Sequence, residues 1–171
     1  MYAGKSTELI RRINRYKCLN KKIIIINHKL NNRYGSNGLT THNKEFIENC
    51  IILEKLSELD NNILYNAEVI IIEELQFFED SYDNIVNWCD YLGKIVIAAG
   101  LNGDCNREPF GDVLKLIPHV DKLTKLSALC KKCGDGTAAN FSKKIIENTN
   151  KTLIGSDGIY EAVCRKHFLE N

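Results

Sequence analysis

Two adjacent carboxylates, Glu73 and Glu74, directly follow a run of four β-branched apolar residues at 69–72. Such a run, without polar alternation, is typical of a parallel strand that helices cover on both faces. Ligands of open α/β sheets bind at the carboxyl ends of the strands. Because Gln76 and Phe77 follow closely, the segment predicts a reaction centre at that edge. The segment alone is equally compatible with a strand that runs into a solvated acidic turn.

The start of the chain favours the reaction centre. Residues 3–7 read Ala-Gly-Lys-Ser-Thr, the back half of the phosphate-binding pattern G-x-x-x-x-G-K-[ST]. In this pattern Gly4 lets the backbone approach phosphate, Lys5 reaches the β- and γ-oxygens, and the Ser6 hydroxyl can bind Mg²⁺. The amphipathic pattern of residues 9–17 predicts a helix whose N-terminus points at the phosphates. The first glycine and its preceding strand are missing, so we expect that the chain is truncated at its front or that its start is misassigned.

Four potential metal ligands occur as two pairs near the C-terminus. Cys130 and Cys133 form one C-x₂-C pair, and Cys164 and His167 form a second pair with the same spacing. The chain has 171 residues and seven Cys, an odd number, which favours a reducing compartment over a disulfide framework. The two pairs therefore predict a tetrahedral structural Zn²⁺ site. The alternative is independent thiols and a surface histidine.

The elements that must position these residues alternate between strand and helix, which is the rhythm of an α/β fold. The predicted strands cover residues 22–27, 50–53, 69–72, 94–99 and 122–129, and the predicted helices cover residues 9–17, 56–64 and 82–92. Long polar loops are predicted over 28–43 and 100–111. In the first of them Arg33 could reach a phosphate or be a solvated loop residue. We expect an α/β domain over residues 1–120 and a zinc-binding domain over residues 121–171.

Composition limits the partners that this chain can have. It is 44% hydrophobic and 26% charged, with a formal net charge of +1, so it has the composition of a globular protein and lacks the basic excess of a nucleic-acid binder. The longest apolar runs are of strand length, too short to span a membrane. No signal peptide is visible at the N-terminus. We expect a cytoplasmic protein without nucleic-acid or membrane partners.

Taken together and in order, these residues resemble the zinc-containing (type II) thymidine kinases, a family with cytosolic cellular and viral members. The resemblance covers essentially the whole chain. It rests on Gly4-Lys5-Ser6-Thr7-Glu8-Leu9, Asn32-Arg33-Tyr34, Thr41-His42, Glu74-x-Gln76-Phe77-Phe78, Arg107-x-Pro109-Phe110-Gly111, the two zinc pairs and residues 154–160. It implies a RecA-like P-loop parallel sheet flanked by helices, with a small zinc-ribbon-like C-terminal domain whose flexible loop covers the nucleoside.

The resemblance also implies roles for individual residues. Glu74 matches the catalytic base that takes the proton of the deoxyribose 5′-hydroxyl, and Phe77 matches the aromatic residue that stacks on thymine. The residues expected to bind ATP and Mg²⁺ are Gly4, Lys5, Ser6, Thr7, Arg33, Glu73 and Gln76. The other residues expected to bind the nucleoside are Leu101, Cys105, Phe110, Leu153, Ile154, Gly155 and Tyr160. We expect Lys5 and Glu74 to face each other across one cleft.

Four positions depart from the family pattern. Glu73 stands where Asp is common, Asn31 replaces a frequent acidic residue, Cys105 replaces an aromatic residue, and His167 replaces a Cys of the cellular enzyme. Both Cys and His bind zinc, so the zinc site should survive. The resemblance further implies thymidine and ATP as substrates, a homotetramer, and feedback inhibition by thymidine triphosphate.

Two other functions are compatible with parts of the sequence. One is a P-loop kinase for another nucleoside, such as deoxyuridine or deoxycytidine. The other is a non-enzymatic zinc-ribbon module that binds nucleic acid or a protein partner. The second function predicts a basic stripe with interleaved aromatic residues, which Lys131, Lys132, Lys143 and Lys144 suggest only weakly. It also leaves the carboxylates at 73 and 74 unexplained.

Overall fold

The computed structural model describes residues 2–31, 38–40, 46–145 and 159–170. These residues form two compact units. The first, here called the sheet unit, contains residues 6–102 and 109–123. The second, here called the small unit, is drawn from residues 1–5, 103–108 and 124–171. Each unit has a hydrophobic core of its own.

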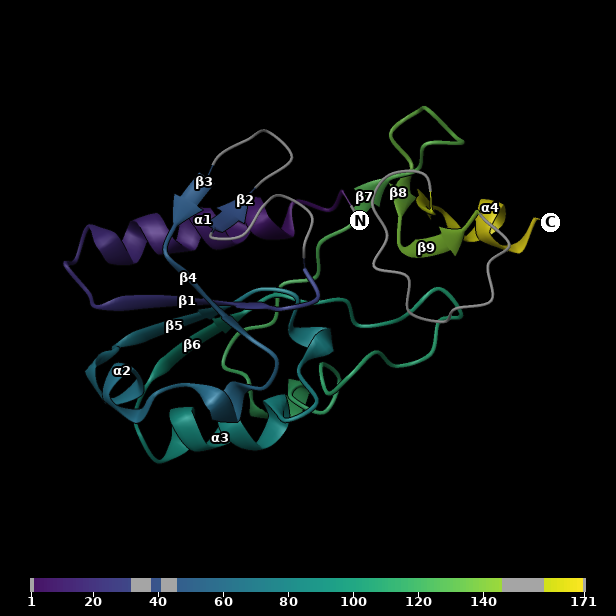
Figure 1. Cartoon of the computed structure of the whole chain (residues 1–171). Helices are drawn as coiled ribbons and strands as arrows, with labels where there is room; N and C mark the ends of the chain where they lie inside the picture. The colour runs from purple at the N-terminus through teal and green to yellow at the C-terminus, as the bar shows by residue number, and fades with distance from the viewer. Residues whose placement is uncertain (1, 32–37, 41–45, 146–158, 171) are drawn as a thin grey trace. The chain divides into compact units, whose positions relative to one another are not determined.

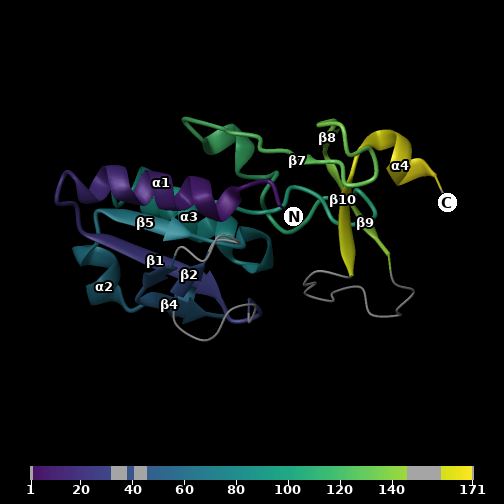
Figure 2. The same ribbon diagram turned by 90° about the horizontal axis from the view of Figure 1, so that it is seen from above.

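The sheet unit is built on four parallel strands in the order β4-β1-β5-β6. The strands are β1 (Ile23–His28), β4 (Cys50–Leu53), β5 (Val69–Ile72) and β6 (Ile95–Ala98), and they lie side by side in Figure 1 and, seen from above, in Figure 2. Ile72 of β5 lies opposite Ile26 of β1 and Ala98 of β6, so the carboxyl ends of these three strands meet at one edge. All four residues of β5 are buried, which confirms the predicted central strand.

Helices cover the two faces of this sheet, as the alternating pattern predicts (Figure 1). On one face α1 (Lys5–Lys17) packs its buried residues Leu9, Ile10 and Ile13 against β1 and β5. The other face carries α2 (Asn61–Asn66) and α3 (Ser81–Asp90), whose Trp88 is buried in the larger core. The parallel α/β fold expected from the sequence is therefore confirmed.

The predicted helix over 56–64 is wrong, because the chain divides it in two. A short 3₁₀ helix, η1 (Leu56–Glu58), is followed by α2. Between them Asp60 has an extended backbone, and its side chain accepts hydrogen bonds from the N–H groups of Asn62 and Ile63. This is the bonding of an N-cap, which starts a new helix and cannot lie inside one.

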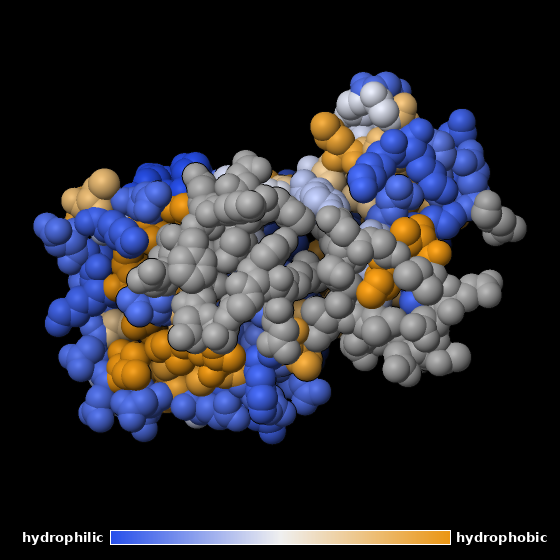
Figure 3. Space-filling model, turned by 45° about the horizontal axis from the view of Figure 1, so that its top comes forward, coloured by the Kyte–Doolittle hydropathy of each residue, from blue (hydrophilic) through white to orange (hydrophobic). Residues whose placement is uncertain are grey.

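Further elements lie in segments predicted to be loops. A hairpin of β2 (Gly38–Thr40) and β3 (Phe46–Glu48) falls partly in the predicted loop over 28–43. The 3₁₀ helices η2 (Leu75–Phe77) and η3 (Ile117–His119) complete the sheet unit. Apolar atoms remain on its surface among hydrophilic ones (Figure 3). Within the described residues, no helix has both the length and the apolar character needed to cross a membrane.

The small unit consists of two short antiparallel pairs and a helix. β7 (Ala128–Leu129) pairs with β8 (Ala138–Ala139), and β9 (Phe141–Lys144) pairs with β10 (Tyr160–Val163). Helix α4 (Arg165–Leu169) follows β10. The predicted strand over 122–129 is wrong except at β7. Residues 122–127 are exposed, and only the two residues of β7 pair with a neighbouring strand.

Candidate functional site

A hydroxyl and a carboxylate that are 67 positions apart in sequence meet at the carboxyl end of β5. Ser6, in the first turn of α1, donates a hydrogen bond to Oε1 of Glu73. Glu73 is buried, and its backbone N–H donates to the carbonyl oxygen of Ile26 at 3.0 Å. The fold therefore joins one residue of the phosphate-binding pattern to the first of the two strand-end acids. Both groups offer oxygen atoms, the ligands that Mg²⁺ prefers.

Glu74 has an unusual backbone. Its φ is 53° and its ψ is 43°, which is the left-handed region, and the residue is only 8% exposed. A residue other than glycine in this region costs roughly 1–2 kcal/mol, and such strain clusters at functional sites. The turn at Glu74 leads into η2, and the Glu74 carboxylate contacts Gln76 of that helix.

The amide of Gln76 is bonded at both ends. Its Oε1 accepts from the backbone N–H of Leu101 at 3.0 Å, and its Nε2 donates to Oε2 of Glu74 at 2.5 Å. Gln76 is 4% exposed, so these bonds are shielded from water. The structure thus joins three residues that the sequence assigned to the site, from the turn after β5 and the loop after β6.

Two glycines let the chain approach Gln76 closely. A Cβ atom at Gly111 would lie 2.4 Å from the carbonyl oxygen of Gln76, and Gly111 has a φ of +58°. A Cβ atom at Gly100 would lie 3.0 Å from Oε1 of Gln76. The space around Gln76 therefore depends on the absence of a side chain at both positions. The sequence pattern included Gly111 without showing this contact.

Four aromatic rings form a continuous group beside the acids. Phe77 meets Phe110 edge-on at 5.6 Å between centroids, which brings together two residues expected to bind the nucleoside. His28, at the end of β1, lies 5.5 Å from Phe77 and 4.7 Å from Phe78. No sequence motif predicts a role for His28, and its place one residue past the predicted strand over 22–27 is the only signal that points to this edge.

In the small unit the predicted metal ligands form a cluster. The ligand atoms of Cys130, Cys133, Cys164 and His167 all lie within 4.8 Å of one another, and no other such group occurs in the part of the chain that the structure describes. Each of the three sulfur atoms lies 3.4–3.8 Å from a neighbouring ligand atom. Three thiols and an imidazole form a donor set typical of structural zinc. The predicted set is therefore assembled and could hold a zinc ion.

The backbone around the cluster favours a thiolate. Burial would raise the pKa of Cys130, but hydrogen bonds from the backbone of Cys164 and Cys133 and from the side chains of His167 and Cys133 lower it to about 6. Burial and the bond to Cys130 raise the pKa of the neighbouring Cys133 thiol to about 11, so the negative charge is favoured on Cys130. The amide of Cys164 lies 3.3 Å from the sulfur of Cys130. Since the thiolate is the form that binds metal, these N–H groups favour the state a cation needs.

Cys105 and Tyr160, two residues expected to bind the nucleoside, both belong to the small unit. Burial raises the pKa of the Tyr160 hydroxyl, and Cys105 and Asp104 raise it further, so Cys105 lies within electrostatic range of Tyr160.

Gly4 has a φ of +76° directly before α1, and it belongs to the small unit together with Lys5. The expected cleft between Lys5 and Glu74 stays a prediction.

The remaining expected site residues give less structural detail. Thr7 lies in the first turn of α1. Arg33, Leu153, Ile154 and Gly155 lie outside the described residues. Their expected contacts with phosphate and with the base therefore stay predictions.

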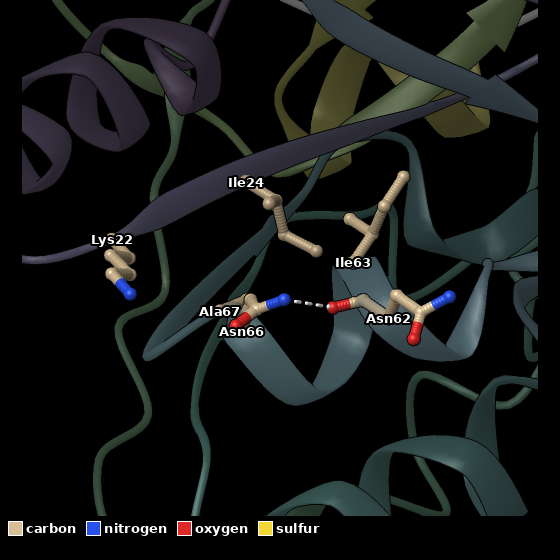
Figure 4. A pocket seen from close by; sticks show the side chains of 6 residues that line it. All are labelled: Lys22, Ile24, Asn62, Ile63, Asn66 and Ala67. Atoms are coloured by element: carbon tan, nitrogen blue, oxygen red, sulfur yellow. Dashed lines mark hydrogen bonds between the residues drawn. The ribbon is translucent and has the colours of Figure 1, made fainter.

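A pocket of about 340 Å³ lies elsewhere in the sheet unit (Figure 4). Lys22 and Ala67, which line it, come just before β1 and β5, so it opens at the amino ends of the strands. In Figure 4 the side chain of Asn66 reaches toward Asn62, and its amide donates to the Asn62 carbonyl at 2.8 Å. The strand-end acids lie at the opposite edge, so this pocket is separate from the candidate site.

Comparison with known proteins agrees with the motifs. The family model described as thymidine kinase matches residues 1–168. The thymidine kinase of Vaccinia virus (strain Western Reserve) is 40% identical over 180 aligned positions, which cover 100% of this chain and 93% of the viral protein. The thymidine kinases of Monkeypox virus and Variola virus are each 39% identical with the same coverage. With a family model and relatives that match along its length, this chain belongs to the thymidine kinase family.

Proposed function

We propose that this protein transfers the γ-phosphoryl group of ATP to the 5′-hydroxyl of thymidine and so forms thymidine monophosphate. The observation that carries the proposal is the edge at the end of β5. There Glu73 meets Ser6 of the phosphate-binding pattern, and Glu74 is held in a buried turn. The relatives named thymidine kinase support the choice of acceptor.

The phosphates of ATP are assigned to the N-terminus of α1. Gly4, Lys5, Ser6 and Thr7 supply backbone N–H groups, an ammonium group and hydroxyls, and a helix N-terminus favours negative charge. The Ser6 hydroxyl and the Glu73 carboxylate fit Mg²⁺ by their chemistry, and the bound ion would neutralise charge on the phosphate oxygens. The longer Glu73, in place of Asp, keeps that negative charge.

Glu74 is assigned to the acceptor. Transfer of a phosphoryl group passes through a loose transition state, so positioning and charge neutralisation contribute more than strong base catalysis. A carboxylate is a weak base toward a sugar hydroxyl, and Glu74 therefore orients the 5′-oxygen and accepts its proton late. Burial and a fixed turn suit this task because they hold the carboxylate in one place.

The thymine ring is assigned to the aromatic residues of the same edge. Phe77 stacks on the base, with Phe110 edge-on to it, and by the family resemblance Leu101 lines the same pocket. By the family resemblance, Tyr160 contacts the sugar side, and Cys105 occupies a further nucleoside-binding position. By the family resemblance, Arg33 reaches a phosphate, and the backbone of residues 153–155 reads the base. A site that bonds the edge of one base rejects bases that leave its polar groups unpaired.

The remaining assignments follow the family. The cluster at Cys130 holds structural Zn²⁺, and residues 1–120 and 121–171 act as a catalytic part and a zinc-binding part. The protein is a cytoplasmic P-loop enzyme and assembles as a homotetramer. Thymidine triphosphate inhibits it by binding across the nucleoside pocket.

One assay tests the reaction and its main rival. The protein is incubated with labelled ATP and, separately, with thymidine, deoxyuridine, deoxycytidine or deoxyadenosine, and the monophosphates are quantified. We expect ATP-dependent thymidine monophosphate with the highest kcat/KM of the four. A higher kcat/KM for deoxycytidine would assign a different acceptor. Absence of any monophosphate, together with salt-dependent DNA binding, would favour the non-enzymatic module.

A further inference from the structure

We infer that Gln76 is the positioning residue for Glu74, through a directed hydrogen bond that joins the carboxylate to the loop after β6. The inference deepens the proposed kinase function and rests on it. The family resemblance implies that Gln76 binds the nucleotide. The new role follows from which end of its amide faces which partner.

The orientation of the Gln76 amide is fixed by the backbone. The N–H of Leu101 can only donate, and it points to the amide at 3.0 Å, so the atom that receives it must be the oxygen Oε1. The other end of the amide is then the NH₂ group, which lies 2.5 Å from Oε2 of Glu74. The bond therefore fixes the position of the Glu74 carboxylate relative to the loop after β6.

The surroundings leave this amide no second arrangement. Gln76 is buried at 4% exposure, and Gly100 and Gly111 both bring the backbone close to it. With Oε1 bonded to Leu101 and Nε2 bonded to Glu74, the amide has no end free to turn toward a nucleotide without leaving a buried partner unpaired. The bond also spans the left-handed turn at Glu74, so it fixes the direction in which the carboxylate points.

The test exchanges the donor for an acceptor of the same shape. Gln76→Glu keeps an oxygen for the N–H of Leu101 and places a second carboxylate against Glu74. Two carboxylates at such a distance cannot both ionise easily. We expect the acid side of the kcat profile for thymidine phosphorylation to move to higher pH by about 1 unit or more, while the KM for thymidine changes less than about threefold.

Asn102→Asp is the matched control. It adds the same charge on an exposed side chain, one residue beyond Leu101. We expect this variant to keep the wild-type pH profile. An unshifted profile in Gln76→Glu, or an equal shift in Asn102→Asp, would overturn the positioning role.

A second readout does not depend on the reaction. Urea unfolding, followed by the fluorescence of Trp88, reports on the sheet unit because this single tryptophan is buried there. The destabilisation of Gln76→Glu should grow as the pH rises from 5 to 8, since deprotonation creates the repulsion. The double variant Glu74→Gln with Gln76→Glu restores a donor–acceptor pair and should recover most of the stability without recovering kcat.

These measurements separate the two proposals. If the wild type phosphorylates no nucleoside, the proposed function fails, and the unfolding data still decide whether Gln76 and Glu74 are paired. If the wild type is active and the loss of stability in Gln76→Glu does not depend on pH, the inference fails and the function stands.

Discussion

At the scale of single residues, Glu74 combines a carboxylate with a backbone conformation that favours glycine. The strain is offset locally, because the side chain bonds Gln76 two positions further on and the turn is buried. The same residue therefore carries the proposed chemistry and the strain. Gly111, which lies against the backbone of Gln76, shows the complementary case, because a side chain at this position would have no space.

Replacing the carboxylate tests the role of Glu74 directly. Glu74→Gln keeps the size of the side chain and removes its ability to accept a proton, so kcat should fall by about 10² or more while thymidine binding stays nearly intact. Steady-state kinetics and a thymidine titration measure the two quantities. Glu79→Gln, which changes an exposed acid of the same segment, should keep the wild-type kcat. Equal turnover of Glu74→Gln and the wild type would remove Glu74 from the base role.

The closeness of Gly111 to Gln76 predicts an unequal pair of glycine variants. Both Gly111 and Gly93 have a positive φ, of +58° and +61°, but a Cβ atom at Gly93 would meet nothing within 4 Å. Gly93→Ala should cost only the left-handed strain, roughly 1–2 kcal/mol. Gly111→Ala adds an overlap with the Gln76 carbonyl, and overpacking of this kind costs a further ~1–3 kcal/mol.

Urea unfolding monitored by Trp88 fluorescence measures both losses in the same unit. Similar losses in the two variants would mean that the contact between Gly111 and Gln76 relaxes freely. A larger loss in Gly111→Ala, accompanied by a lower kcat, is the expected result, because the overlap displaces the residue that holds Glu74.

At the scale of elements, the parts that could be predicted are those with one dominant signal. The β-branched run at 69–72 and the apolar stripe of α1 each specify one type of element, and both are present. The region 56–64 has enough apolar residues for one helix, but Asp60 caps a new helix within it. The sequence signal of one capping side chain is weaker than the signal of a periodic apolar pattern, so the pattern decided the prediction. In the segment over 122–129, which has the composition of a strand, strand pairing is limited to the two residues of β7.

The candidate site divides in the same way. The types of its residues and their place at strand ends could be read from the pattern, because a parallel sheet gathers those ends at one edge. The bond between Ser6 and Glu73 follows this logic. The orientation of Gln76 and the ring of His28 against Phe77 could not be predicted, because they depend on contacts between side chains from different elements.

His28 links the end of β1 to the turn after β5 and gives the sheet unit a dependence on pH. Its Nδ1 accepts from the N–H of Leu30 at 3.1 Å, so Nε2 carries the proton and donates to the carbonyl of Glu54 at 3.1 Å. Burial lowers the pKa of His28, opposed by the Glu54 carbonyl and the charges of Glu54 and Glu58. Protonation would break the bond from Leu30.

The sign of the effect follows from these states. The unfolded chain binds a proton near the ordinary pKa of 6.5, and the folded protein binds it only at lower pH, so stability rises with pH in this range. The contribution of His28 is present above about pH 6.5 and is lost as the pH falls below it. We expect the urea midpoint to drop less between pH 7.5 and 5.5 in His28→Gln than in the wild type. Equal drops would contradict the buried neutral ring.

At the scale of the whole molecule, the two units differ in what stabilises them. The buried core of the sheet unit contains Trp88, Phe78 and many Ile and Leu residues. The buried core of the small unit consists of three Ala, two Cys and Val163. Side chains this small bury little apolar surface, and units of this size commonly need a metal or disulfides. The cluster at Cys130 is therefore expected to supply most of the small unit's stability.

This difference predicts a selective effect of metal removal. Protein purified without chelator should contain about one zinc per chain, and structural zinc sites contribute on the order of 10 kcal/mol to folding. A strong chelator should abolish hydrogen-exchange protection of the amides in β7–β10, while Trp88, buried among residues of the sheet unit alone, keeps its fluorescence. Cys133→Ser should lose zinc in the same way. Cys18→Ser changes an exposed thiol outside the cluster and should retain its zinc, because it removes no ligand. Hydrogen-exchange protection of β7–β10 that survives both the chelator and Cys133→Ser would show that the core of the small unit needs no metal.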